Sequence, residues 1–192
     1  MRRLPILAAA ALLFATPALA HSGHGAHGGL VAGFVHPMTG LDHMLAMLGV
    51  GLWAGLALKR DWWLWPATFV GFMVAGFAAG LGAAALPGVE GVIAASVIAL
   101  GLAVAFNLKA PAMVGAAVVA VFGLAHGYAH GQELPTGVSG VEFAAGFVAA
   151  TIALHLAGFG LSWMVGRLNA RVLARVSGLG LATAGLALAW LG

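Results

Sequence analysis

Long apolar runs separated by short polar segments make up most of the chain. Beyond residue 33 there are six such runs, each about 20 residues long, which is the length a helix needs to cross ~30 Å of hydrocarbon. The runs lie at residues 34–57, 64–86, 90–107, 112–131, 138–165 and 172–191. This pattern predicts an all-α integral membrane protein whose six transmembrane helices form one bundle, packed through the many small residues.

The first 33 residues follow a different pattern. Two arginines at positions 2 and 3 precede a short apolar stretch, which the small residues Ala18-Leu19-Ala20 bring to an end. These three features predict a cleavable signal peptide over residues 1–20. The alternative is an uncleaved first helix, but Pro5 and Pro17 leave its apolar run short for a span. Cleavage leaves a His- and Gly-rich extracytoplasmic segment at residues 21–33.

The amino-acid composition also indicates an integral membrane protein. Only 7% of the residues are charged, against about 25% in soluble domains. The formal net charge of +3 comes from basic residues scattered between apolar runs, so no nucleic-acid partner is expected. The absence of cysteine excludes disulfides, thiolate metal sites and cysteine nucleophiles. No nucleotide is expected as a partner, because the chain has no G-x-x-x-x-G-K-[ST] motif.

The basic residues also predict an orientation. They flank the connections after the first, third and fifth helices, and the connections after the second and fourth contain no Lys or Arg. Positive charge favours the cytoplasmic side, so both mature termini are expected outside the cytoplasm of a bacterial inner-membrane protein. The residues that carry this argument are Lys59, Arg60, Lys109, Arg167, Arg171 and Arg175.

Two groups of histidines and carboxylates lie at the predicted outer ends of helices. His36, Asp42 and His43 fall at the start of the first helix, where Pro37 favours a helix start. A spacing of seven residues brings His36 and His43 to one helical face. An ionisable group at the bilayer centre costs at least ~2.5–3.5 kcal/mol, so such clusters indicate function rather than packing.

The second group, His126, His130 and Glu133, ends the fourth helix with spacings of four and three residues, which again stacks its members on one face. Gly127 and Gly131 leave room beside these histidines for another helix or an ion. Imidazole and carboxylate without thiolate suit nickel, cobalt, zinc or copper. The two groups therefore predict a site for a divalent metal ion, or a proton path.

Further candidates are weaker. Glu142 begins the fifth helix, and His155 lies deeper in it, where a hydrogen-bonded interior histidine is an equally good interpretation. Met44 and Met47 are better explained as packing residues than as thioether ligands. In the N-terminal segment, His21, His24 and His27 form a short tract that binds metal or is a flexible tail.

Two motifs resemble those of the HupE/UreJ family of nickel and cobalt permeases. The stretch HPMTGLDHMLAML at residues 36–48 resembles H-P-x-x-G-x-D-H, and HGYAHGQELP at residues 126–135 resembles H-G-x-A-H-G-x-E. The resemblance implies that residues 34–192 are a permease domain for inward transport of Ni²⁺ or Co²⁺, without a prosthetic group. It makes both histidine groups the expected metal site.

The sequence also contains features of functions other than transport. Gly137-Val138-Ser139-Gly140 resembles the G-x-S-G motif of rhomboid proteases, but Ser139 and His155 are expected on one helix, where Ser139 acts as the N-cap. A metal sensor or accessory protein without transport remains an alternative, as does a proton or ammonia channel. The sequence leaves homo-oligomerisation open as well, and does not separate nickel from cobalt or zinc.

Overall fold

The structure, a computed structural model, describes residues 27–167 and 171–191, and these residues form helices and no strand. The predicted signal peptide, with His21 and His24, lies outside the described residues. The described helices are α2 (His27–Thr39), α3 (Leu41–Leu58), the 3₁₀ turn η1 (Lys59–Asp61), α4 (Leu64–Gly80), α5 (Val89–Ala105), α6 (Ala112–Gln132), α7 (Gly140–Arg167) and α8 (Arg171–Leu191).

Several of these helices are long and apolar enough to cross a membrane. By length and composition, α3, α6, α7 and α8 meet that requirement among the described residues. The equally apolar α4 and α5 have 17 residues each, which spans about 26 Å at ~1.5 Å per residue. The all-helical, multi-spanning class is therefore confirmed, and the count of six spans stays a prediction.

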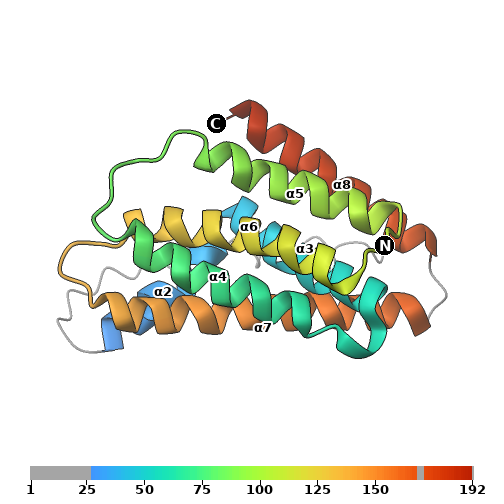
Figure 1. Cartoon of the computed structure of the whole chain (residues 1–192), viewed down its shortest axis with the longest axis horizontal. Coiled ribbons are helices and arrows are strands. Elements are labelled where there is room, and N and C mark those ends of the chain that lie inside the picture. The colour runs from blue at the N-terminus through green and yellow to red at the C-terminus, as the bar shows by residue number, and fades with distance from the viewer. Residues whose placement is uncertain (1–26, 168–170, 192) are drawn as a thin grey trace, which may run out of the picture.

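The long helices pack in pairs. Helix α4 lies along α6, α5 along α8, and both α2 and α3 pack on α7 (Figure 1). Glycines permit the close approach of backbones that is typical of membrane bundles. A Cβ on Gly127 of α6 would overlap the carbonyl oxygen of Met73 on α4, and a Cβ on Gly51 of α3 would overlap that of His155 on α7.

The predicted first helix is wrong in its extent. A helix was expected over 34–57, starting at Pro37, whereas α2 already begins at His27, holds Pro37 inside it, and is separated from α3 by Gly40. Proline gives no N–H to the ladder, and the Thr39 hydroxyl donates to the His36 carbonyl oxygen at 2.7 Å. Both features favour a helix end here, so His36 and His43 lie on different helices.

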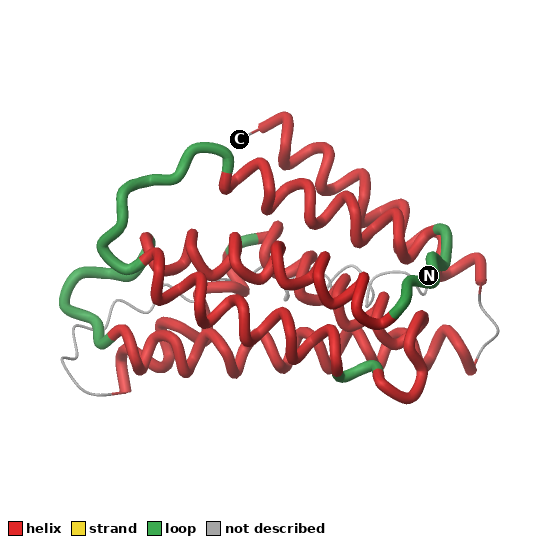
Figure 2. Tube along the Cα trace, in the orientation of Figure 1, coloured by secondary structure: helices red, strands yellow, loops and turns green. Residues whose placement is uncertain are grey.

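The connecting segments gather at the two ends of the bundle (Figure 2). Residues 81–88 and 133–139 lie at one end, which we call the acidic end because Glu90, Glu133 and Glu142 are next to them. Residues 106–111 and η1 lie at the other end, which we call the basic end because these segments contain Lys59, Arg60 and Lys109. Sequence and packing thus separate the charges along the bundle axis.

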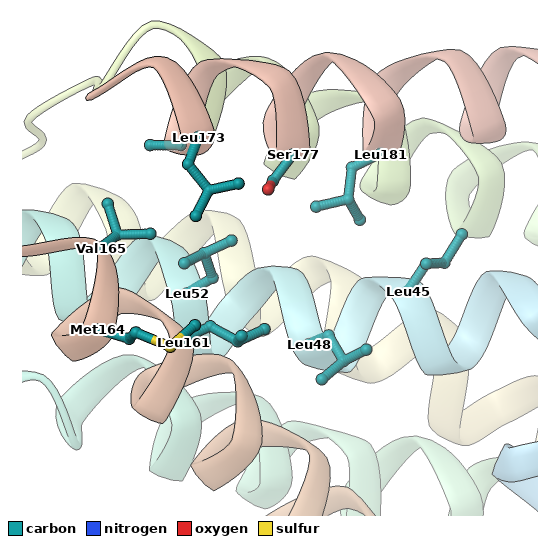
Figure 3. Close-up of a pocket in the computed structure, with 10 residues that line it drawn as sticks. Leu45, Leu48, Leu52, Leu161, Met164, Val165, Leu173, Ser177 and Leu181 are labelled. Atoms are coloured by element: carbon teal, nitrogen blue, oxygen red, sulfur yellow. The ribbon is translucent and has the colours of Figure 1, made fainter. Parts of the chain in front are cut away.

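Helix α8 joins the rest of the bundle chiefly through α5, which itself packs on α3 and α6. Between α8 and the pair α3–α7 is a cavity of about 260 Å³, lined mostly by leucines with Ser177 pointing into it (Figure 3). Helices α2, α3, α4, α6 and α7 carry the two histidine groups and the aromatic rings that pack on them.

Candidate metal site

The two predicted histidine groups meet at the acidic end. His36 comes from the end of α2, His43 from the first turn of α3, His126 and His130 from the last turns of α6, and Glu133 directly follows α6. The His36 Nε2 atom lies 2.8 Å from Glu133 Oε2, and His130 Nδ1 lies 3.3 Å from the same oxygen. One ligand atom from each of these three residues falls within 4.8 Å of the others.

His43 joins this group through its ring. The ring centroid of His43 is 4.2 Å from that of His130 and 4.8 Å from that of His126. Its Nδ1 lies 2.7 Å from Asp42 Oδ1, which also accepts the His43 backbone N–H at 2.8 Å. A carboxylate on one ring nitrogen fixes the tautomer and leaves the other nitrogen as a metal ligand. Asp42 therefore positions the His43 Nε2 atom.

His126 is held in the same way by backbone. Its Nδ1 lies 2.9 Å from the Phe122 carbonyl oxygen, so the ring donates there and its Nε2 lone pair is left available. The Nε2 atoms of His43, His126 and His130 are buried and have no hydrogen-bond partner. Buried polar atoms are nearly always satisfied. Three unsatisfied imidazole nitrogens in one cluster fit a site that binds a cation.

The solvent exposure of the side chains in this cluster falls from Glu133 toward the interior of the bundle. The side chain of Glu133 is 50% exposed, that of His36 is 28% exposed and that of His130 is 2% exposed. Hydrogen bonds from His130 and His36 hold the pKa of Glu133 well below its usual range, so this carboxylate is ionised at physiological pH. A cation arriving at the acidic end would meet negative charge first and buried nitrogen afterwards.

Not every predicted residue belongs to this cluster. Glu142 lies in the first turn of α7 against Gly29 of α2. His155 is on the same helix, separated from His126 by Phe69, whose ring centroid is 5.3 Å from that of His155 and 5.5 Å from that of His126. His27 is the first residue of α2.

The geometry of α7 excludes the protease interpretation. The Ser139 Oγ accepts the Glu142 N–H at 3.4 Å, as an N-cap does. Helix α7 then runs without a break from Gly140 to Arg167. Sixteen residues of helix separate Ser139 from His155 by about 24 Å, and a catalytic pair needs about 3 Å.

Aromatic residues that the sequence did not single out pack on the histidines. Phe143 lies 5.3 Å from His36 and Phe147 lies 4.1 Å from His130, measured between ring centroids. Both come from α7, and they form the wall opposite α6. A phenylalanine in an apolar helix gives no sequence signal of this role.

Comparison with known proteins agrees with the geometry. The family model described as HupE / UreJ protein matches residues 9–188. This chain belongs to the HupE/UreJ family. It is 45% identical over 175 residues to Protein HupE of Rhizobium leguminosarum bv. viciae, which covers 91% of this chain and 92% of that protein. No solved structure matches the chain.

Membership confirms the resemblance that the two motifs suggested. HupE/UreJ proteins are associated with nickel and cobalt transport and form a transporter family rather than an enzyme family. Both motifs contribute to the cluster, the first through His36, Asp42 and His43 and the second through the residues of α6 and Glu133. Which of these side chains bind an ion stays a prediction.

Proposed function

We propose that the chain is a secondary transporter that takes Ni²⁺ or Co²⁺ inward across a bacterial inner membrane. The acidic end is the extracytoplasmic entrance, and the ion is substrate rather than a resident cofactor. His36, Asp42, His43, His126, His130 and Glu133 form the entrance site.

One observation carries this proposal, namely the convergence of His36, His130 and Glu133 within 4.8 Å. These ligand atoms come from α2, α6 and the segment after α6, so the site exists only when the helices are packed. Imidazole and carboxylate are suitable ligands for nickel and cobalt. Glu133 attracts the ion, and the buried nitrogens replace part of its hydration shell.

Inward movement needs no nucleotide. A membrane potential of 100 mV, negative inside, contributes about 2.3 kcal/mol per charge, hence about 4.6 kcal/mol for a divalent ion. This corresponds to a concentration ratio above about a thousandfold. The potential alone is therefore sufficient to drive accumulation.

The competing function is a membrane accessory protein that binds metal without moving it. Competitive uptake of labelled nickel, cobalt and zinc by cells that express the chain separates the two. A transporter raises cellular nickel or cobalt, and His43→Ala removes the increase while the protein still reaches the membrane. Unchanged metal content on expression would support the accessory function.

A further inference from the structure

A second group of electron-pair donors lies deeper in the bundle. Thr151 of α7, Met47 of α3 and Met73 of α4 are each 0% exposed. The Thr151 Oγ1 atom lies 3.3 Å from Met47 Sδ and 3.5 Å from Met73 Sδ. Three helices thus bring one hydroxyl and two thioethers together at a place where packing alone requires only apolar side chains.

The hydroxyl proton cannot satisfy all of its neighbours. Thr151 Oγ1 has one hydrogen, and the Phe147 carbonyl oxygen at 2.9 Å is its best acceptor. Lone pairs of the hydroxyl oxygen and of both sulfurs then face one another. Two ligand atoms, each ~2.3 Å from a metal ion and at right angles, are about 3.3 Å apart, which matches the oxygen–sulfur separations.

His155 lies one helical turn beyond Thr151. It is 2% exposed, and neither of its ring nitrogens has a hydrogen-bond partner. It also borders an apolar surface groove of about 420 Å³ between α4 and α7, which extends to Trp62 and Trp63, next to η1 at the basic end.

Met47, Thr151 and His155 lie further along α3 and α7 from the entrance site, toward the basic end. Met47 follows His43 by four residues on α3, and His155 follows Thr151 by four residues on α7. Each interval of four residues is about 6 Å along a helix. Close packing of Gly51 on the His155 carbonyl holds α3 and α7 at a fixed height relative to each other.

We propose that Met47, Met73, Thr151 and His155 form an inner metal station, distinct from the entrance site, that receives a divalent transition-metal ion on its way to the basic end. This inference rests on the proposed transport function. The thioethers and hydroxyl bind weakly, which lets the ion move on, and His155 supplies a nitrogen ligand one helical turn nearer the basic end.

The first test removes the sulfurs and keeps the packing. Leucine has nearly the volume of methionine, so the full-length double variant Met47→Leu with Met73→Leu should fold. We expect nickel uptake into proteoliposomes to fall on the order of tenfold. Calorimetric nickel affinity at the entrance site should stay within about twofold of wild type, which also verifies folding.

The second test uses the absence of cysteine from the natural sequence. In His155→Cys, added Cd²⁺ should produce a thiolate-to-metal charge-transfer band in the ultraviolet, and Ni²⁺ should reduce it by competition. Ala153→Cys, two residues away on the exposed side of α7, is the control and should give no such band. Size-exclusion elution and helical circular dichroism confirm that both variants are folded.

Either of two results overturns the inner station. One is a folded His155→Cys protein that shows no cadmium-dependent absorption band. The other is a rate of nickel uptake by the double leucine variant that equals the wild-type rate. Failure of the proposed function has a different signature, because neither wild-type protein nor His130→Ala would then accumulate nickel, while the cadmium band at position 155 persisted.

Discussion

Replacing Glu133 by Gln tests the electrostatic part of the entrance site. Glutamine keeps the shape and length of the side chain and removes one negative charge. Glu133 Oε2 lies 2.8 Å from His36 Nε2 and 3.3 Å from His130 Nδ1, so an ion held by those nitrogens would be close to the carboxylate. We expect weaker nickel binding with little loss of stability.

The magnitude follows from Coulomb's law. Two unit charges 4 Å apart attract by about 1 kcal/mol in bulk water, hence by about 2 kcal/mol when one of them is divalent. The bulk-water value is appropriate because the Glu133 side chain is 50% exposed. A loss of about 2 kcal/mol weakens binding by roughly 30-fold.

The assay is calorimetric titration of purified protein with Ni²⁺, followed by initial uptake rates at low nickel. Asp61→Asn is the matched control, since it makes the same charge change at the basic end and should leave affinity unaltered. Nickel affinity of Glu133→Gln within twofold of wild type would refute the assignment of Glu133 to the site.

Three further outcomes are expected. Lowering the external pH from 7 to 4 should reduce nickel uptake, because histidine must be neutral to bind metal. The pKa of Glu133 lies well below its usual range, so this carboxylate stays charged over that interval, and uptake that is unchanged at pH 4 would contradict the histidine site. Gly127→Ala should destabilise the protein by about 1–3 kcal/mol, because the added methyl group overlaps the Met73 carbonyl oxygen. Gly91→Ala is the control, since its methyl group enters open space. Equal unfolding temperatures for the two variants would show that the α4–α6 contact is not tight. Ser139→Ala should lower the free energy of unfolding by about 1 kcal/mol because it removes an N-cap, and it should leave nickel uptake normal. A serine-reactive phosphonate should not label the wild-type protein, and labelling would support the protease interpretation.

Helical spacing was a good guide where the helix is continuous. The interval of four between His126 and His130 placed both on one face of α6, as the structure shows. The interval of seven residues between His36 and His43 predicted that these two side chains lie close together on one helix. They do belong to the same cluster, but they are on two different helices. Gly40 interrupts the helix, and His36 reaches the site because α2 folds across α7.

Pairings between distant helices could not be derived from the sequence. Nothing in the order of residues says that Glu133 should contact His36, since that depends on which helices are neighbours. Met47 and Met73 carry even less signal, because a methionine in an apolar helix is normally a packing residue. Their relation to Thr151 becomes visible only when α3, α4 and α7 are placed side by side.

Nickel uptake by the purified chain in proteoliposomes with an imposed potential, negative inside, tests the central claim most directly. The account predicts that labelled nickel accumulates with wild-type protein, without nucleotide, and that accumulation is lost in His130→Ala. Liposomes that bind nickel at their surface but do not accumulate it, with wild type and His130→Ala alike, would contradict the account.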